Sequence, residues 1–244
     1  MENIKIVVEY DGTNYCGWQF QKNTSLTIQQ KLEDCLTKLN KSLVKVIGAG
    51  RTDSGVHALG QVANFNLDVS IPIGKIPKAL NSMLPEDIIC KKAEKEADDF
   101  HASFCATGKK YRYRIFNHSH GSVFIRNFVY NIYQPVNITK IKKVIDQLRG
   151  THDFSSFQSS NSEVSSTIRT INQIELIEKA PEYWIEITGN GFLYNMVRII
   201  VGTLIEIGLD KRKPDLIEIL ESKNRIKAGF TAPARGLTLV KVYY

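Results

Sequence analysis

The sequence predicts an α+β protein built from two split βαβ halves, whose antiparallel sheets meet at a central cleft and carry their helices on one face. Two hydrophobic patterns indicate this class. Short segments in which every second residue is apolar are typical of half-buried strands, and they alternate with segments whose apolar residues recur every three or four positions, as in amphipathic helices. This succession occurs twice in 244 residues, and 43% apolar residues suffice for a packed core.

The first half predicts the order β-α-β-β-α-β, which is that of ferredoxin-like and RNA-recognition folds. In the first strand the apolar residues recur at every second position from Ile4 to Val8. The predicted elements are a strand from Asn3 to Tyr10, a helix from a cap at Ser25 or Thr27 to Asn40, strands from Leu43 to Ile47 and from Val62 to Leu67, a helix from Pro72 to Pro85 and a strand from Ile88 to Ala93.

The second half repeats this pattern, and we divide the chain near residue 105 into domains 1–105 and 106–244. A serine-rich segment from Ser155 to Thr167 is expected to be a loop. The predicted elements are a strand from Lys109 to Phe116, a segment from Phe128 to Tyr133 that continues or neighbours it, a helix from Ile138 to Leu148, strands from Thr167 to Ile177 and Tyr183 to Thr188, helices from Leu193 to Ile207 and Pro214 to Leu220, and a strand from Leu237 to Tyr244.

Charge and cysteine content indicate which kind of partner and which cellular compartment the protein has. A formal net charge of +7 favours a polyanionic partner such as nucleic acid, although such a charge also occurs in proteins without one. No C-x-x-C spacing, arginine-rich leader, signal peptide or long apolar run is found. We therefore expect a cytoplasmic protein that has reduced thiols and does not contact a membrane.

The chain is organised around a polar loop that follows the apolar run ending at Ile47. Glycines within the stretch from Gly48 to Ala58 let its backbone approach a bound group closely. Arg51, two residues before Asp53, favours the ionised form of that carboxyl group. Such an aspartate is suited to act as a nucleophile or a base. The alternative is an ordinary hairpin turn, in which Asp53 and Ser54 bond the local backbone.

Arg198 stands in a helix that is apolar nearly all round, between Val197 and Ile199. A buried guanidinium needs a partner, because removing its charge from water is costly. We expect this partner to be Asp53, which would place the active centre between the two halves. The alternative is that Arg198 lies at an exposed edge of the helix.

Tyr111 lies in the most basic and aromatic stretch of the chain, which runs from Lys109 to Arg114. A tyrosine there can stack on a base while neighbouring cations hold phosphates. Packing of the ring against a helix is the alternative. Further cations are candidates for extending such a track or are simply solvated surface: Lys140, Lys142, Lys143, Arg149, Lys211, Arg212, Lys213, Arg225, Lys227 and Arg235.

Four motifs resemble, in order, those of the tRNA pseudouridine synthase A family: Arg51 to Ala58, Lys110 to Tyr113, Gly150 to Phe154 and Phe192 to Arg198. The first is highly specific, and the set spans essentially the whole chain. The resemblance implies isomerisation of uridine to pseudouridine at positions 38, 39 and 40 of the tRNA anticodon stem-loop by a homodimer, with no cofactor or metal.

The same resemblance implies a role for each matching residue. It makes Asp53 the nucleophile, with Arg198 paired to it and Tyr111 stacked on the target base. Ser54 and the pair Tyr194 and Asn195 depart from the residues of many members, and we assign them no role. The expected substrate-binding residues are Arg51, Thr52, Tyr111 and Leu237.

The chemistry of such an isomerase agrees with an aspartate nucleophile. The base must leave the stack, its C1′–N1 bond must break, the uracil must turn, and C5 must join C1′. A carboxylate can capture the sugar at C1′ or add to C6 of the ring, and both routes remain open. Nothing is oxidised and nothing leaves, so the reaction requires no cofactor.

Other classes of protein remain as alternatives. A non-catalytic RNA-binding module on the same sheet needs no paired aspartate and arginine. An aspartic protease would share the Asp53-Ser54-Gly55 sequence, but Arg51 and the predicted helices oppose it. A metal hydrolase would rest on His118 and His120, which have no carboxylate close in sequence.

Overall fold

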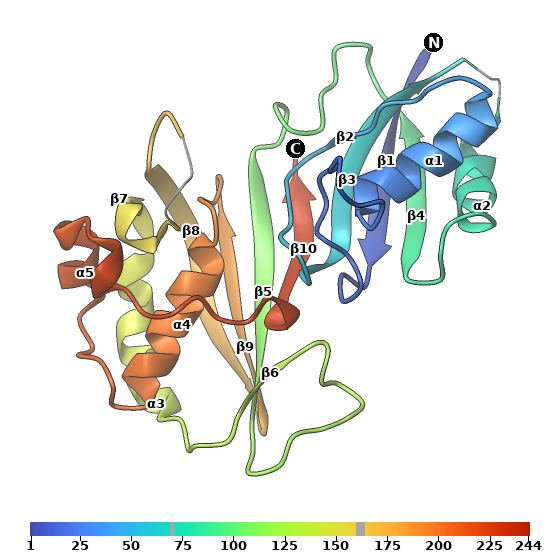
Figure 1. The fold of residues 1–244 in the computed structure, drawn as a ribbon. Coiled ribbons are helices and arrows are strands. Elements are labelled where there is room, and N and C mark those ends of the chain that lie inside the picture. Colours follow the sequence, from blue (N-terminus) through green and yellow to red (C-terminus); the bar gives the residue numbers. More distant parts are fainter. Residues whose placement is uncertain (69–70, 160–163) are drawn as a thin grey trace. The chain divides into compact units, whose positions relative to one another are not determined.

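The computed structural model describes residues 1–68, 71–159 and 164–244, and it confirms the predicted α+β class. The chain folds into two compact units. The first unit comprises Met1–Thr107 together with Thr238–Tyr244, and the second comprises Gly108–Leu237. Each unit has its own strands and helices (Figure 1).

The first unit shows the strand order of a split βαβ sheet. Strand β1 pairs in antiparallel fashion with β4 on one side and β3 on the other, and β3 also pairs with β2 near one end and, in parallel, with β10 near the other. The elements are β1 (Glu2–Tyr10), α1 (Ile28–Asn40), β2 (Ile47–Gly48), β3 (His57–Leu67), α2 (Ile76–Asn81), β4 (Ile88–Lys95) and β10 (Leu237–Tyr243).

Local sequence explains where β1 and α1 begin and end. The apolar residues from Ile4 to Val8 that recur at every second position in β1 are buried, as the alternation predicts. Thr27 is the N-cap of α1, and its side chain accepts a hydrogen bond from the backbone N–H of Gln30. The helix ends where Lys41 adopts a left-handed conformation with φ of 57°.

The predicted strand from Leu43 to Ile47 is wrong, since only Ile47 and Gly48 pair with β3. The reason is that side chains of α1 take the backbone groups that a strand would use. The N–H of Val44 donates to the Thr37 hydroxyl at 3.1 Å, and the N–H of Val46 donates to the Glu33 carboxylate at 3.0 Å. The segment therefore lies along α1 as an extended loop.

The second predicted helix of this unit is shorter than the run from Pro72 to Pro85. A 3₁₀ turn over Ile73–Lys75 precedes α2, which ends at Asn81. Pro77 has no N–H to donate to the carbonyl of Ile73, so a continuous α-helix cannot run through this point.

The second unit has the strand order β5-β9-β8-β7, all in antiparallel pairs. Strand β6 pairs in parallel with β5, so the segment after Phe128 is a neighbour of that strand and not its continuation. The short strand β7 was not predicted. The elements are β5 (Gly108–Asn117), β6 (Tyr130–Ile132), α3 (Ile138–Val144), β7 (Gly150–Asp153), β8 (Ile168–Lys179), β9 (Glu182–Gly189), α4 (Met196–Gly208) and α5 (Leu216–Ser222).

Helix α4 forms the core of the second unit, and Figure 1 shows it lying beside α3 on one face of the sheet. It begins three residues later than predicted, because Asn195 adopts φ of 60° and breaks the helical path. A Cβ atom on Gly202 would lie 1.8 Å from the carbonyl oxygen of Phe230, so only glycine lets the two segments approach this closely. Within the predicted loop from Ser155 to Thr167, residues 160–163 lie outside the described residues.

The closing strand belongs to a different unit from the one to which the division at residue 105 assigned it. Residues 238–244 group with the first unit. The cause is parallel pairing, in which Thr238 and Leu239 of β10 lie opposite His57 and Ala58 of β3. Pairing between segments this far apart in sequence leaves no local signal.

Among the residues that the structure describes, no helix has both the length and the apolar character needed to cross a bilayer.

Candidate active site

The aspartate loop lies between β2 and β3 in the first unit and is fixed at both ends. The N–H of Ala49 donates to the carbonyl of Val62 at 2.8 Å. At the tip, the N–H of Val56 donates to the carbonyl of Asp53 at 3.1 Å, and Gly55 has φ of 76°, which favours glycine. Asp53 is half-buried. The loop therefore holds a partly accessible carboxylate on a tight, hydrogen-bonded turn.

A second loop, which precedes α1, packs directly on the aspartate loop. The N–H of Trp18 donates to the carbonyl of Thr52 at 3.0 Å. A Cβ atom on Gly17 would lie 2.6 Å from that same oxygen, and one on Gly12 would lie 2.0 Å from the carbonyl oxygen of Val56. Sequence analysis missed this role of Gly12 and Gly17. The signal was two glycines in one short loop, but only the tertiary contact shows what they face.

The other predicted residues of this loop differ in exposure. Arg51 is exposed, as a substrate-binding cation would be. Thr52 is buried, and its hydroxyl is hydrogen-bonded to that of Tyr10 at 2.8 Å. Ser54 donates to the carbonyl of Tyr15 at 3.1 Å, so the residue that departs from the family pattern helps hold the loop.

Arg198 is half-buried on α4, with Val197 and Ile199 buried on either side of it in sequence. Its Nε donates to the carbonyl of Ala232 at 2.8 Å, and its Nη1 donates to the Asn195 side-chain oxygen at 2.7 Å. Two hydrogen bonds within the second unit therefore fix the orientation of the guanidinium. Asn195 received no role from the sequence because it departs from the residues of some family members, and the structure shows that it holds Arg198.

Tyr111 lies on β5 opposite Ile187 of β9 and is 8% exposed. The edge of one ring meets the face of the other between Tyr111 and Phe192, with ring centroids 5.2 Å apart and planes at 86°. Tyr113 points to the same side of the strand, and burial raises the pKa of its phenol while the charges of Arg198 and Arg235 oppose that rise. Tyr111 and Arg198 are thus carried by packed parts of one unit.

The basic stretch on β5 is an ion-pair ladder with β9. Lys110 and Arg112 both bond the Glu186 carboxylate, with Arg112 Nε at 2.7 Å, and Arg114 pairs with Glu182. Burial alone would raise the pKa of Glu186, but hydrogen bonds from these two cations lower it below its ordinary value. The positive charges here are therefore largely compensated by carboxylates.

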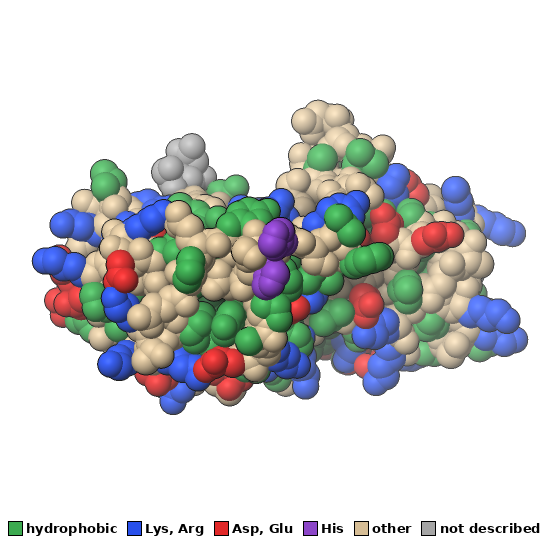
Figure 2. Space-filling view, turned by 90° about the horizontal axis from the view of Figure 1, so that it is seen from below, with side chains coloured by type: hydrophobic (Ala, Val, Ile, Leu, Met, Phe, Trp, Pro, Cys, Tyr) green, Lys and Arg blue, Asp and Glu red, His purple; other side chains and the backbone are tan. Residues whose placement is uncertain are grey.

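On the face that Figure 2 shows, surface charge does not mark a basic patch. In Figure 2 the Lys and Arg side chains are spread over the visible face with Asp and Glu side chains between them. Leu237, the remaining predicted substrate-binding residue, is buried at the start of β10. Across the described part of the chain, no group of three or more His, Cys, Asp or Glu side chains is placed to hold a metal ion.

Two comparisons of sequence identify relatives of the chain. The model of a family described as tRNA pseudouridine synthase matches residues 6–105 and 144–244. A tRNA pseudouridine synthase A of Thermoanaerobacter sp. (strain X514) is 51% identical over 245 residues, covering 100% of both chains. One of Acetivibrio thermocellus is 48% identical with the same coverage.

Among solved structures, a Cbf5-Nop10-Gar1 complex is similar with a TM-score of 0.41 and 14% identity, over 97% of this chain and 48% of that one.

Fold and site together define an α+β protein that carries a loop carboxylate in one compact unit and an anchored guanidinium beside aromatic side chains in the other. Such groups suit a protein that does chemistry on a nucleic-acid base. The full-length match to the relatives makes the assignment specific: the chain belongs to the tRNA pseudouridine synthase family.

Proposed function

We propose that this protein isomerises uridine to pseudouridine at positions 38, 39 and 40 of the tRNA anticodon stem-loop. The observation that carries the proposal is the match over the whole chain to enzymes named tRNA pseudouridine synthase A. The tight loop around Asp53 adds support, because it holds a carboxylate in a fixed, partly accessible position.

In this proposal Asp53 is the nucleophile, and Arg198 pairs with it. The hydrogen bonds that hold Arg198 support this role, because a guanidinium with a fixed orientation pairs with a carboxylate at little entropic cost. The pair would keep the carboxylate ionised and ready to attack C1′ or C6 of an extruded uridine.

Tyr111 would stack on the extruded base and assist removal of the C5 proton, with Phe192 holding its ring from the side. Arg51 would hold the flipped nucleotide through its phosphate. Thr52 would act through the backbone of the loop, because its hydroxyl already bonds Tyr10. Leu237 would pack against the base or the Tyr111 ring.

The proposed enzyme acts in the cytoplasm as a homodimer and needs no cofactor. These three properties come from the family resemblance and from the balance of the reaction, in which no atom is lost and none is oxidised.

Replacing the proposed nucleophile tests the function directly. We expect Asp53→Asn to fold as the wild type does and to bind tRNA with an affinity within about twofold of it, because the side-chain volume is kept. The variant should not isomerise uridine. The measurement is chemical tagging of pseudouridine in an unmodified tRNA transcript after incubation with each protein. Turnover retained by the variant would remove Asp53 from the mechanism. A peptidase assay on the same preparations addresses the protease alternative, which predicts cleavage and no pseudouridine.

A further inference from the structure

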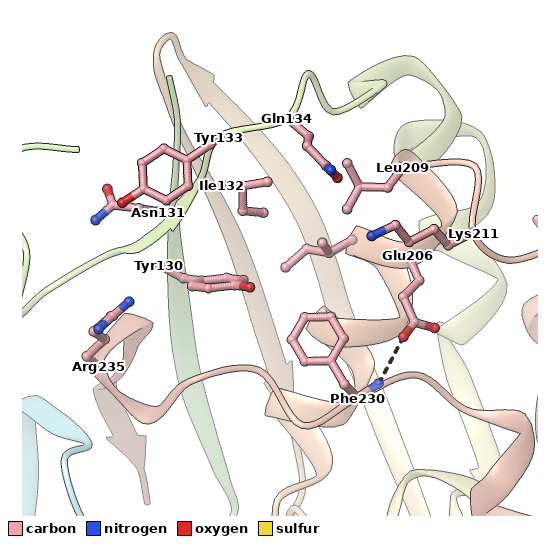
Figure 3. A pocket seen from close by; sticks show the side chains of 11 residues that line it. Tyr130, Asn131, Ile132, Tyr133, Gln134, Glu206, Leu209, Lys211, Phe230 and Arg235 are labelled. Atoms are coloured by element: carbon pink, nitrogen blue, oxygen red, sulfur yellow. Dashed lines mark hydrogen bonds between the residues drawn. The ribbon is translucent and has the colours of Figure 1, made fainter. Parts of the chain in front are cut away.

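A pocket of about 490 Å³ lies within the second unit, at the opposite end of α4 from Arg198 (Figure 3). This volume falls in the range of roughly 300–1,000 Å³ that ligand sites occupy. Its walls come from β6 and the residues after it, from the last turns of α4, and from the segment that precedes β10. Eight residues separate Arg198 from Glu206 in the wall, which corresponds to about 12 Å along the helix. Along α4, this part of the wall therefore lies about two turns away from Arg198.

Aromatic rings form much of this pocket. Tyr130 and Phe230 both line the cavity, with ring centroids 6.2 Å apart and planes at 66°. Tyr133 stands at the rim, 61% exposed. Rings that are accessible from one side provide a stacking surface for a planar ligand, and every nucleobase has such a face.

The charges in the wall favour an anion. The acid Glu206 is already compensated, because Arg212 donates to its Oε2 from Nε at 2.8 Å and approaches it with Nη2 at 2.7 Å. Lys211 is exposed, its side chain points into the pocket in Figure 3, and it makes no ion pair with any residue that the structure describes. Arg235 lines the same cavity beside Tyr130.

We propose that this pocket binds a single nucleotide of the RNA substrate other than the target uridine, with its base against Tyr130 and Phe230 and its phosphate at Lys211. The inference rests on the proposed function, since it takes the ligand to be part of the tRNA. The rings and the uncompensated cation together match how proteins hold an unstacked nucleotide of single-stranded RNA.

The test compares three variants in tRNA binding. Lys211→Gln removes the phosphate contact from an exposed position, and Tyr130→Leu removes the ring while keeping an apolar side chain. Lys213→Gln is the matched control, because Lys213 is an exposed lysine two residues away that does not line the pocket. Equilibrium binding of an unmodified transcript is measured from 50 to 200 mM salt, and circular dichroism verifies folding.

We expect Lys211→Gln to weaken binding about three- to tenfold and to reduce the slope of log K against log salt by about one, as for the loss of one phosphate contact. Tyr130→Leu should weaken binding about five- to fiftyfold, as for the loss of one stacked base. Lys213→Gln should change affinity less than twofold. Equal effects of the two lysine variants would overturn the proposal, because they would show only diffuse attraction.

Two further arms separate the possible outcomes. If free uridine 5′-monophosphate binds tightly in a Lys211-dependent way while the variants bind tRNA normally, the ligand is a free nucleotide and the RNA site is refuted. Pseudouridine formation is assayed in parallel with wild-type protein. If the wild-type protein forms pseudouridine but the variants bind tRNA as wild type does, the pocket proposal is refuted and the proposed function stands. If the variants bind tRNA more weakly but the wild-type protein forms no pseudouridine, the proposed function is refuted and the pocket proposal stands.

Discussion

Asn195 shows how much of the proposed chemistry depends on one residue that touches no reacting atom. Its side-chain oxygen accepts from Arg198 Nη1, its amide donates to Ser159 at 2.9 Å, and its φ of 60° begins α4. The same residue therefore sets the start of the helix and the direction of the guanidinium. We regard it as a positioning residue.

Asn195→Gly tests this role, because glycine accepts the positive φ but cannot hold Arg198. We expect kcat for pseudouridine formation to fall about tenfold with KM for tRNA unchanged, since an Arg198 that has lost its hydrogen bond to Asn195 is less well oriented to pair with Asp53. The measurement is steady-state kinetics, with Tyr194→Phe as a control on the neighbouring residue. A purely structural role would instead lower the melting temperature and leave kcat of the folded fraction unchanged.

At the scale of elements, side-chain hydrogen bonds at the ends of strands fix how the strands connect to the loops. The short strand β7 ends at Asp153, whose Oδ1 accepts from the Thr167 hydroxyl at 2.6 Å and from the Ser155 N–H at 3.0 Å. The hydrogen bond from Thr167 contributes most to lowering the pKa of Asp153 to about 2. This carboxylate thus joins the end of β7 to the start of β8.

The lowered pKa has a consequence for stability. The folded-state pKa of Asp153 lies below its unfolded value, so its contribution is complete above about pH 4 and is lost as pH falls toward 2. We expect Asp153→Asn to reduce the free energy of unfolding by about 2 kcal/mol at pH 7, and by about half as much at pH 3. Urea unfolding of both proteins at several pH values measures this difference. A difference that does not change with pH would contradict it.

Glycines at the contact between two loops act at the same scale. Gly17 has φ of 95° and leaves no space for a Cβ beside the Thr52 carbonyl. Gly17→Ala should therefore push the loop that carries Asp53 out of place. We expect pseudouridine formation to fall at least tenfold while tRNA binding is largely kept. Gly74→Ala, at a glycine with open space around it, is the control and should behave as wild type.

At the scale of the whole molecule, the C-terminal strand connects the end of the chain to its beginning. β10 pairs with β3, the N–H of Thr107 donates to the carbonyl of Tyr243 at 2.9 Å, and the Tyr244 hydroxyl donates to the carbonyl of Ala102 at 2.8 Å. The first unit is therefore complete only when residues 238–244 are in place.

A chain that stops at Leu237 tests this dependence. We expect backbone amides near the start of β3 to exchange with deuterium at least tenfold faster than in the full chain, because β3 loses its parallel neighbour. Strands β8 and β9, which belong to the other unit, serve as the internal reference. Unchanged protection of β3 would show that the strand is dispensable.

Sequence reasoning succeeded where the signal was local. The alternation in β1 and the polar loop around Asp53 could be predicted, and the cap of α1 was narrowed to Ser25 or Thr27, of which the structure shows Thr27, because neighbouring residues determine these features. It failed where distant groups decide. The apolar residues before Ile47 predicted a strand, but the N–H groups of Val44 and Val46 donate to side chains of α1 and not to a neighbouring strand. The anchor of Arg198 on Ala232 depends on a contact 34 residues away and has no local pattern.

The ion pairs between β5 and β9 reduce the long-range electrostatic attraction between this part of the protein and a polyanion. Lys110 and Arg112 both pair with Glu186, and Arg114 pairs with Glu182, so these three cations and two carboxylates carry a net charge of only +1. Salt screens that charge beyond about one Debye length of 8–10 Å, so the most basic stretch of the sequence attracts a distant polyanion only weakly. The long-range attraction of an approaching tRNA would come from cations that have no carboxylate opposite them.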